Sequence, residues 1–258
     1  MILAPGTETN AQYHANPAWG STLINDFIAS PTIAHLKRTG QIPPEESSAL
    51  TLGQAFHARF DPHTTAPLIG PDVSSRRTKA WGEFQAAHPD AVCLLPDEVR
   101  QIDAMEAAVR ANPYARDLLD GAEHEVVVRR ESPYGAYGVQ CRIDLWRPGL
   151  FAADLKTTSD LDGWGRSVAA YGYHRQAAFY RWLIAQETAE ILPFSFIVVE
   201  KDAPHRCRVI ELDDAYLAAG WREVETALID IGQRTLTGDW SDPGFQVLTA
   251  PGWLRQAA

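Results

Sequence analysis

The residues best placed to do chemistry are two aspartates and a lysine in the middle of the chain, Asp144, Asp154 and Lys156. Asp154 and Lys156 are two positions apart, so in a β-strand their side chains project from one face while Leu155 points to the other. The turn Arg147-Pro148-Gly149 folds the preceding strand back, which can bring Asp144 close to Asp154. Two carboxylates at a hairpin suit a hard cation such as Mg²⁺, and the Lys156 ammonium can orient an attacking water or offset charge in the transition state.

Two upstream residues have the chemistry to join this group. Gly53 and His57 are four apart on a short predicted helix, where the imidazole can serve as a further metal ligand. Glu125 opens a valine-rich strand and can face the same cleft, with Glu123 as the competing choice. Taken singly, an Asp-x-Lys pair is more often a surface ion pair, and a lone histidine is more often packed or solvated. The presence of all these residues in one chain is what favours a functional site.

Downstream, Gln176 and Tyr180 share one face of a long predicted helix, with Tyr173 one turn earlier. These side chains can contact a phosphate or a nucleobase, although core packing explains the tyrosines equally well.

The periodicity of apolar residues predicts one α/β domain covering 1–258. No repeat or linker marks a boundary within it. We expect a helical N-terminal part (about 13–121), a catalytic sheet with flanking helices (about 122–236) and a tail (237–258) anchored by Trp240, Phe245 and Trp253. Helices are predicted at 21–37, 51–60, 76–87, 96–111, 173–189 and 213–236. Strands are predicted at 124–130, 138–146, 150–157, 194–199 and 207–211.

Composition narrows the class of protein. The 258 residues are 45% hydrophobic, which excludes a disordered or low-complexity chain. Cys93, Cys141 and Cys207 lie far apart without a C-x-x-C pair, which favours a reducing compartment and argues against a zinc knuckle or a four-cysteine iron–sulfur cluster. No apolar run approaches the roughly 20 residues of a membrane span. We therefore expect a cytoplasmic protein without a membrane partner. A net charge of −10 weighs against a nucleic-acid binder without excluding one.

The ordered set of Gly53-x-x-x-His57, Glu125, Asp144, Asp154-x-Lys156 and Gln176-x-x-x-Tyr180 resembles the PD-(D/E)XK nuclease superfamily in its RecB-like arrangement. The flanking sequences resemble the exonuclease VIII (RecE) nuclease domain of phages and prophages, from about Tyr13 to Asp213. They include S-T-L-I-N-D-F-I-A-S-P from Ser21, T-L-G-Q-A-F-H-A from Thr51, R-R-T-K-A from Arg76, D-L-K-T-T from Asp154 and Y-G-Y-H-R-Q-A-A-F-Y from Tyr171.

The resemblance implies a restriction-endonuclease-like α/β fold, a mixed central sheet flanked by helices. It also implies a metal-dependent, ATP-independent exonuclease that degrades the 5′ strand of linear double-stranded DNA. The remaining 3′ single strand would serve a RecT-type annealing protein in phage-type recombination. Members of the family form homo-oligomeric rings, and the sequence does not distinguish a trimer from a tetramer.

The resemblance also implies a role for each matching residue. Mg²⁺, with Mn²⁺ as a substitute, would be held by His57, Asp144, Asp154 and the carbonyl of Leu155. Lys156 would activate the water, and Glu125 would support the water or a second metal. DNA would be contacted by Arg76, Arg77, Lys79, Arg166, Gln176 and Tyr180. The competing interpretation of the Arg76 to Lys79 run is a solvated helix N-terminus.

Ile143 replaces the superfamily's proline before the first aspartate, a tolerated variation, and the acidic balance departs from a basic DNA-binding surface. Three alternatives stay open. The chain can be a RecB- or Cas4-like DNA nuclease without the iron–sulfur cluster, a catalytically silent DNA-binding module on the same fold, or a metal hydrolase of small phosphate esters. The absence of a G-x-x-x-x-G-K-[ST] motif excludes a built-in ATP motor of that type.

Overall fold

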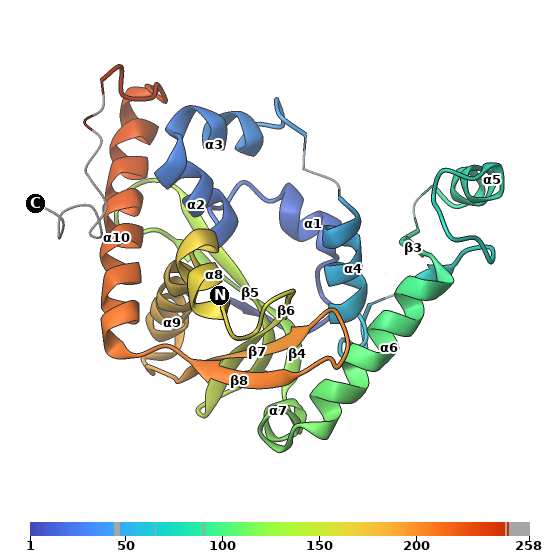
Figure 1. The fold of residues 1–258 in the computed structure, drawn as a ribbon. Helices are drawn as coiled ribbons and strands as arrows, with labels where there is room; N and C mark the ends of the chain where they lie inside the picture. The colour runs from blue at the N-terminus through green and yellow to red at the C-terminus, as the bar shows by residue number, and fades with distance from the viewer. Residues whose placement is uncertain (44–46, 65, 90, 246, 248–258) are drawn as a thin grey trace, which may run out of the picture.

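A six-stranded mixed sheet lies at the centre of the protein in the computed structural model, which describes residues 1–43, 47–64, 66–89, 91–245 and 247 (Figure 1). The strand order is β1-β4-β5-β6-β7-β8, in which β6 and β7 are parallel and all other neighbours are antiparallel. The strands are β1 (Ile2–Leu3), β4 (Glu123–Glu131), β5 (Gly138–Arg147), β6 (Phe151–Thr158), β7 (Phe194–Glu200) and β8 (Cys207–Glu211). The mixed sheet flanked by helices that the sequence predicted is therefore confirmed.

Helices cover both faces of the sheet, each over its own hydrophobic core. On the first face, side chains such as Ile143 and Phe196 pack with α2 (Ser21–Ala29), α3 (Pro31–Arg38), α8 (Trp164–Tyr171), α9 (Tyr173–Thr188) and α10 (Asp214–Thr237). On the second face, side chains such as Leu155 and Ile197 pack with α4 (Ser48–His57), α6 (Pro96–Ala111) and α7 (Pro113–Leu119). A short helix, α1 (Asn10–Ala15), follows β1. None of the helices in the described residues is long and apolar enough to cross a membrane.

A small arm projects from the N-terminal end of α6 (Figure 1). It consists of β2 (Leu68–Ile69) and β3 (Cys93–Leu94), which pair in parallel, and α5 (Lys79–Ala87). Trp81 is its buried centre. The guanidinium of Arg76 lies 5.2 Å from the Trp81 ring centroid. Its Nη1 and Nη2 atoms donate to the two carboxylate oxygens of Glu98 on α6. The arm is therefore fixed to α6 by a planar two-bond ion pair.

The helical connection between β6 and β7 turns sharply at Gly172, which joins α8 to α9. Gly172 has a φ of 69°, in the left-handed region that glycine adopts without strain. A Cβ atom there would lie 2.7 Å from Oδ1 of Asn25, and Nδ2 of Asn25 donates to the carbonyl of Tyr171. The position of the first turn of α9 relative to the sheet is thus fixed by α2.

Several predicted boundaries are wrong for identifiable reasons. The helix predicted at 21–37 is two helices, because Ser30 adopts extended backbone and caps α3 through Ile33 N–H, with Pro31 in its first turn. The helix predicted at 76–87 begins only at Lys79, because Thr78 caps it. The helix predicted at 51–60 spans Ser48–His57. Helices α1, α7 and α8 and the strands β1, β2 and β3 were not predicted, because they are too short to show periodicity.

The tail predictions have different outcomes. Trp240 packs between two aromatic rings, 5.8 Å from the Trp19 centroid and 4.7 Å from that of His35, whereas Phe245 is exposed. Trp253 lies outside the described residues.

The close crossing of α9 and α10 gives a stability prediction. A Cβ atom at Gly220 would lie 2.3 Å from the carbonyl oxygen of His174, whereas nothing lies within 4 Å of one at Gly82 in α5. We expect Gly220→Ala to destabilise the protein by about 1–3 kcal/mol through overpacking. Gly82→Ala should instead stabilise it by about 0.5–1 kcal/mol, because alanine loses less backbone entropy in a helix. Urea unfolding of both variants measures the contrast, and equal effects would contradict it.

Candidate active site

The site lies where β5 and β6 separate. Their ladder runs from Arg147↔Phe151 to Leu145↔Ala153 and ends there, and the next residue on each strand is an aspartate, Asp144 or Asp154. Oδ2 of Asp144 accepts a hydrogen bond of 2.7 Å from the backbone N–H of Leu155. A side-chain carboxylate therefore takes the place of a backbone acceptor and holds the two strands apart at this point.

The side-chain alternation of β5 also breaks at Asp144. Ile143 belongs to the core on the first face of the sheet, and Leu145, two residues later, belongs to the core on the second face. Opposite this break, between the pairs His124↔Leu145 and Val126↔Ile143, lies Glu125 with a φ of 54°. A non-glycine residue in the left-handed region costs about 1–3 kcal/mol and marks sites where function fixes the backbone.

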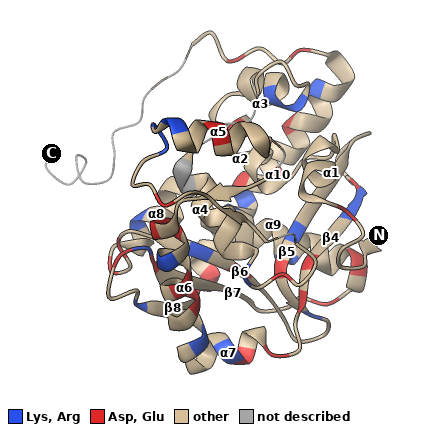
Figure 2. Ribbon diagram, turned by 90° about the vertical axis from the view of Figure 1, so that its right-hand side faces the viewer, with Lys and Arg blue, Asp and Glu red and all other residues tan. Residues whose placement is uncertain are grey.

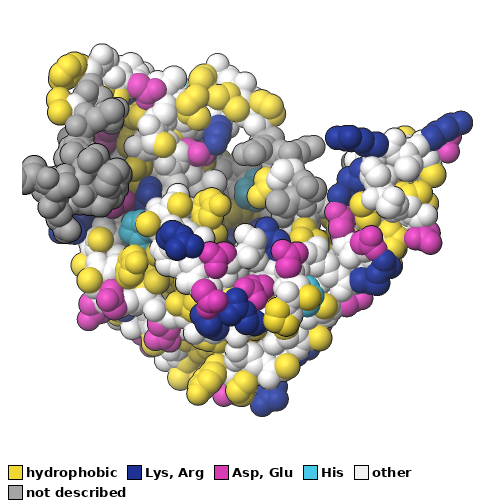
Figure 3. Space-filling view, viewed as in Figure 1, with side chains coloured by type: hydrophobic (Ala, Val, Ile, Leu, Met, Phe, Trp, Pro, Cys, Tyr) yellow, Lys and Arg dark blue, Asp and Glu magenta, His cyan; other side chains and the backbone are white. Residues whose placement is uncertain are grey.

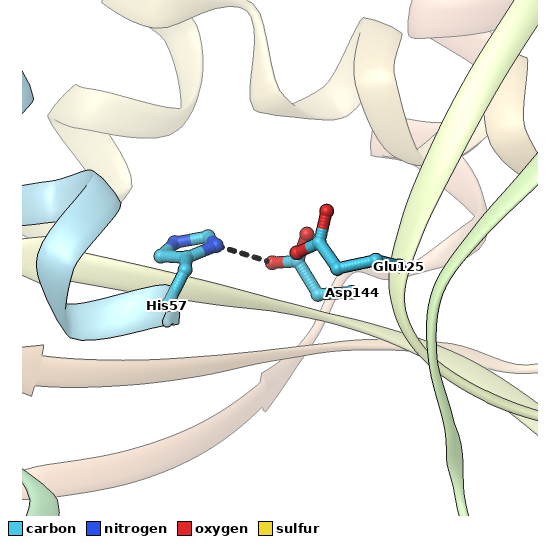
Figure 4. A group of neighbouring side chains, drawn as sticks. All are labelled: His57, Glu125 and Asp144. Atoms are coloured by element: carbon cyan, nitrogen blue, oxygen red, sulfur yellow. Dashed lines mark ion pairs between the residues drawn. The ribbon is translucent and has the colours of Figure 1, made fainter. Parts of the chain in front are cut away.

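His57 reaches the two acids from the last turn of α4 (Figure 4). Its Nδ1 atom lies 3.2 Å from Oδ2 of Asp144. One ligand atom each from His57, Glu125 and Asp144 lies within 4.8 Å of the others. An imidazole nitrogen and two carboxylate oxygens at this spacing can surround one divalent cation.

Asp154 is almost completely buried and is held from the other face of the sheet. Nε2 of Gln176 on α9 donates to its Oδ1 at 2.5 Å, and the Lys156 ammonium forms an ion pair with its Oδ2. The Lys156 Nζ also lies 5.2 Å from the ring centroid of Tyr173, in the range of a cation–π contact. The same-face geometry predicted for Asp154 and Lys156 is thus what the strand shows.

The acids of the site are crowded in a poorly solvated space. Burial, reinforced by the Asp144 charge, raises the pKa of Glu125 to about 7 and that of Asp154 to about 6. Burial also opposes ionisation of Asp144, but the His57 and Lys156 charges and the Leu155 N–H outweigh it and lower the pKa of Asp144. The site therefore carries two carboxyl groups that ionise reluctantly.

The pKa values of Lys156 and His57 shift in the direction opposite to the one that burial alone would give. Burial alone would lower the pKa of Lys156, but the Asp154 and Asp144 carboxylates raise it. For His57, the Asp144 carboxylate overcomes burial in the same way and raises the pKa. The acids that face Lys156 and His57 therefore favour protonation of both groups.

Arg142 belongs to this site, although no motif pointed to it. Its Nε lies 2.6 Å from Oε2 of Glu125, its Nη2 donates to Oδ1 of Asn10 at 2.8 Å, and its guanidinium lies 4.8 Å from the Tyr13 ring centroid. It therefore connects Glu125 to α1. Its only sequence signal is its position two residues before Asp144.

The structure also distinguishes Glu125 from Glu123. Glu123, at the start of β4, is exposed and is not one of the clustered residues, whereas Glu125 is. The side chain of Leu155 is buried in the second-face core, and its N–H is the group that contacts Asp144.

The residues expected to contact DNA fall into three environments. Gln176 is committed to Asp154, and Tyr180 is 6% exposed, with its ring edge-on to Phe194, so it lies in the core. Arg76 is bound by Glu98. The other three are at the surface, where Lys79 lies 3.6 Å from Glu83, Arg166 donates to Asp160 at 2.8 Å and Arg77 is exposed. Direct DNA contact by these residues stays a prediction, which the burial of Tyr180 and the pairing of Arg76 disfavour.

The solved structures that match this chain include the following two. One, described as "Putative exonuclease" from Eubacterium rectale, is 20% identical, covers 100% of this chain and 98% of its own, and has a TM-score of 0.69. At that identity the likeness shows the fold. The second, SSO0001, is 17% identical over 70% of this chain and 86% of its own, and its TM-score of 0.29 supports no argument. None of the curated proteins compared matches the chain.

The resemblance to PD-(D/E)XK nucleases is confirmed by a family model. That model, described as a PDDEXK-like domain of unknown function (DUF3799), matches residues 20–242. The match includes every motif from Gly53 to Tyr180 as well as α10. With its mixed sheet, its separated β5 and β6 strands and its acid–lysine group, the chain belongs to the DUF3799 family of PDDEXK-like domains and has a nuclease fold.

Proposed function

We propose that this protein is a Mg²⁺-dependent, ATP-independent exonuclease that digests linear double-stranded DNA from 5′ ends and leaves 3′ single strands. The observation that carries the nuclease chemistry is the grouping of His57, Glu125 and Asp144 within 4.8 Å, beside the Asp154–Lys156 pair. The polarity and the exonucleolytic mode rest on the sequence resemblance to the exonuclease VIII (RecE) type.

The donor set fits a divalent cation. Two carboxylates and an imidazole face one space, and burial together with the Asp144 charge raises the pKa values of Glu125 and Asp154. His57, Asp144 and Glu125 would hold Mg²⁺, with Asp154 and the Leu155 carbonyl as the further ligands that the resemblance implies. When bound, the ion supplies Lewis-acid stabilisation of negative charge on the scissile phosphate.

The remaining work falls to side chains of β6 and α9. Lys156 keeps its ammonium charged beside Asp154, so it can orient the attacking water and stabilise charge that develops on the phosphate. Gln176 fixes the Asp154 carboxylate from behind. Tyr173 supports the lysine through its ring face. Asp154 and Lys156 are thus positioned by β6 and α9, a regular strand and a long helix that hold them rigidly.

We propose that DNA approaches the protein from the side that carries the arm. Acidic and basic residues are interspersed over the ribbon rather than separated into two faces (Figure 2). The surface is hollowed between the arm and the body, and Lys and Arg side chains lie on the arm (Figure 3). Since Arg76 is bound by Glu98, we propose that Arg77 and Lys79 are the arm residues available for phosphate contacts, which supply affinity without sequence preference.

The assembly and the pathway belong to the same proposal. A homo-oligomeric ring, trimeric or tetrameric, would enclose the duplex and explain how an acidic chain retains it. A RecT-type annealing protein would take the 3′ strand in phage-type recombination. Analytical ultracentrifugation tests the ring, and a monomeric profile at micromolar concentration would exclude it.

End-labelled linear duplex DNA tests the activity directly. With Mg²⁺ and no ATP, we expect stepwise loss of label from 5′ ends. Asp154→Asn and Lys156→Met should each digest at least about 100-fold more slowly, because each removes one charged side chain from the proposed catalytic site. The control is Asp103→Asn, an exposed acid on α6, which should digest like the parent. Loss from 3′ ends would refute the polarity. Cutting of circular DNA would indicate an endonuclease, and intact DNA with every substrate would refute the proposal.

The crowded acids predict how pH and metal affect stability. Glu125 and Asp154 have pKa values raised above their unfolded values, so their ionisation destabilises the folded state as pH rises from about 4 to about 7. His57, whose pKa is raised, also loses its stabilising charge as pH rises above 6.5. We expect the Tm of the metal-free protein to fall between pH 5 and 8, and the Tm gain from Mg²⁺ to grow over that range.

Differential scanning fluorimetry in EDTA and in Mg²⁺ measures both quantities. The matched variant Glu125→Gln/Asp154→Asn should flatten the pH dependence in EDTA and lose most of the Tm gain from Mg²⁺. A gain from Mg²⁺ that is the same at pH 5.5 and pH 7.5 in the parent would contradict the charge assignment.

A further inference from the structure

Three aromatic rings form a chain beside the proposed catalytic lysine. Trp164 on α8 is 3% exposed and stacks on Tyr173, with centroids 5.5 Å apart and planes inclined by 19°. Tyr173 in turn lies 5.7 Å from Tyr171, centroid to centroid, at 42°. Because the Lys156 Nζ lies over the Tyr173 ring, Tyr171 is only two ring contacts away from the lysine.

The three rings differ in exposure. Trp164 is buried, Tyr173 is half-buried and Tyr171 is 65% exposed. Burial explains the first two rings as packing against the sheet, where both also contact Phe196. It does not explain a large ring left in water at the end of the chain of rings, next to the residues that would cleave DNA.

The backbone that carries Tyr171 is held firmly. Its carbonyl accepts from Nδ2 of Asn25 at 3.3 Å, and the following residue, Gly172, is left-handed and lies so close to Asn25 that a Cβ atom there would be 2.7 Å from Oδ1. The N–H of Gly172 closes the last turn of α8 on the Val168 carbonyl. An exposed aromatic ring on a fixed backbone loses little conformational freedom when a flat ligand stacks on it.

We propose that Tyr171 is a nucleobase-stacking subsite, which holds the base of a nucleotide next to the scissile phosphate while Lys156 and the acids act on that phosphate. This inference rests on the proposed nuclease function. Every nucleobase has a π-face, so stacking grips the strand without selecting a sequence. That property suits an enzyme that must advance along any DNA end. Tyr171 is a positioning residue here, and Tyr173 transmits its placement to Lys156.

The test combines removal of the ring with removal of the base. A short 5′-phosphorylated duplex carries a single abasic site, which is moved through the first positions from the end. Its affinity is measured by fluorescence anisotropy with Ca²⁺ in place of Mg²⁺ to suppress cleavage. With the parent protein, the abasic site should weaken binding about tenfold at one position, and with Tyr171→Ala the same abasic site should have no further effect there.

Two variants separate stacking from other effects. Tyr171→Phe keeps the ring and should behave like the parent, which excludes a role of the hydroxyl. Tyr114→Ala removes a ring of similar exposure (73%) from α7, on the other face of the sheet, and should leave both affinity and the abasic pattern unchanged. Equal Tm values for Tyr171→Ala and the parent show that the fold is intact.

The possible results separate a failure of the stacking subsite from a failure of the proposed nuclease function. If the parent digests and binds DNA but the effect of the abasic site never depends on Tyr171, the stacking subsite is refuted while the nuclease function stands. If the parent neither binds nor digests DNA, the proposed function fails and the subsite fails with it.

Discussion

The hydrogen bond from Leu155 N–H to the Asp144 carboxylate is the interaction on which the site depends. At this bond the β5–β6 ladder stops, and Asp144 and Asp154 are the residues that follow its last pair. A backbone acceptor in this place would close the sheet and leave no room between the strands. The carboxylate instead satisfies the buried donor through Oδ2, so Asp144 is both part of the sheet and a candidate metal ligand.

The separation of the strands also explains why helices from both faces reach the same point. His57 arrives from α4 on the second face, and Gln176 arrives from α9 on the first. Within a continuous sheet, the strands themselves would separate side chains that approach from opposite faces. The opened strands bring them to neighbouring carboxylates. The cost is a concentration of buried acid, which the raised pKa values of Glu125 and Asp154 record.

Much of this arrangement could be predicted from the sequence, because it follows from local rules. The alternation of a strand places Asp154 and Lys156 on one side, and the Arg147-Pro148-Gly149 turn pairs their strand with that of Asp144. The helical spacing that placed Gln176 on one face of α9 is equally local.

Other features depend on non-local packing and could not be predicted. The left-handed backbone of Glu125 is a response to the break in β5, and glutamate carries no propensity for it. Arg142 is tied to the site through Asn10, from a distant part of the chain. The pairing of Arg76 with Glu98 removes a cation that the motif alone assigned to DNA. In each case a contact with a distant part of the chain, and not the neighbouring sequence, determines the conformation or the ion pair.

The meander formed by β4, β5 and β6 has a consequence for the order in which the molecule is assembled. Its three strands follow one another in the chain, so their pairing closes only short loops and is favoured early in folding. We therefore expect Asp144 and Asp154 to meet before α4 and α9 dock, at a stage when both acids are still solvated. His57 and Gln176 arrive with those helices and contact Asp144 and Asp154, respectively. The proposed cation site, which includes His57, would thus be complete only once both cores have closed, and the proposed nuclease activity would begin only when folding is complete.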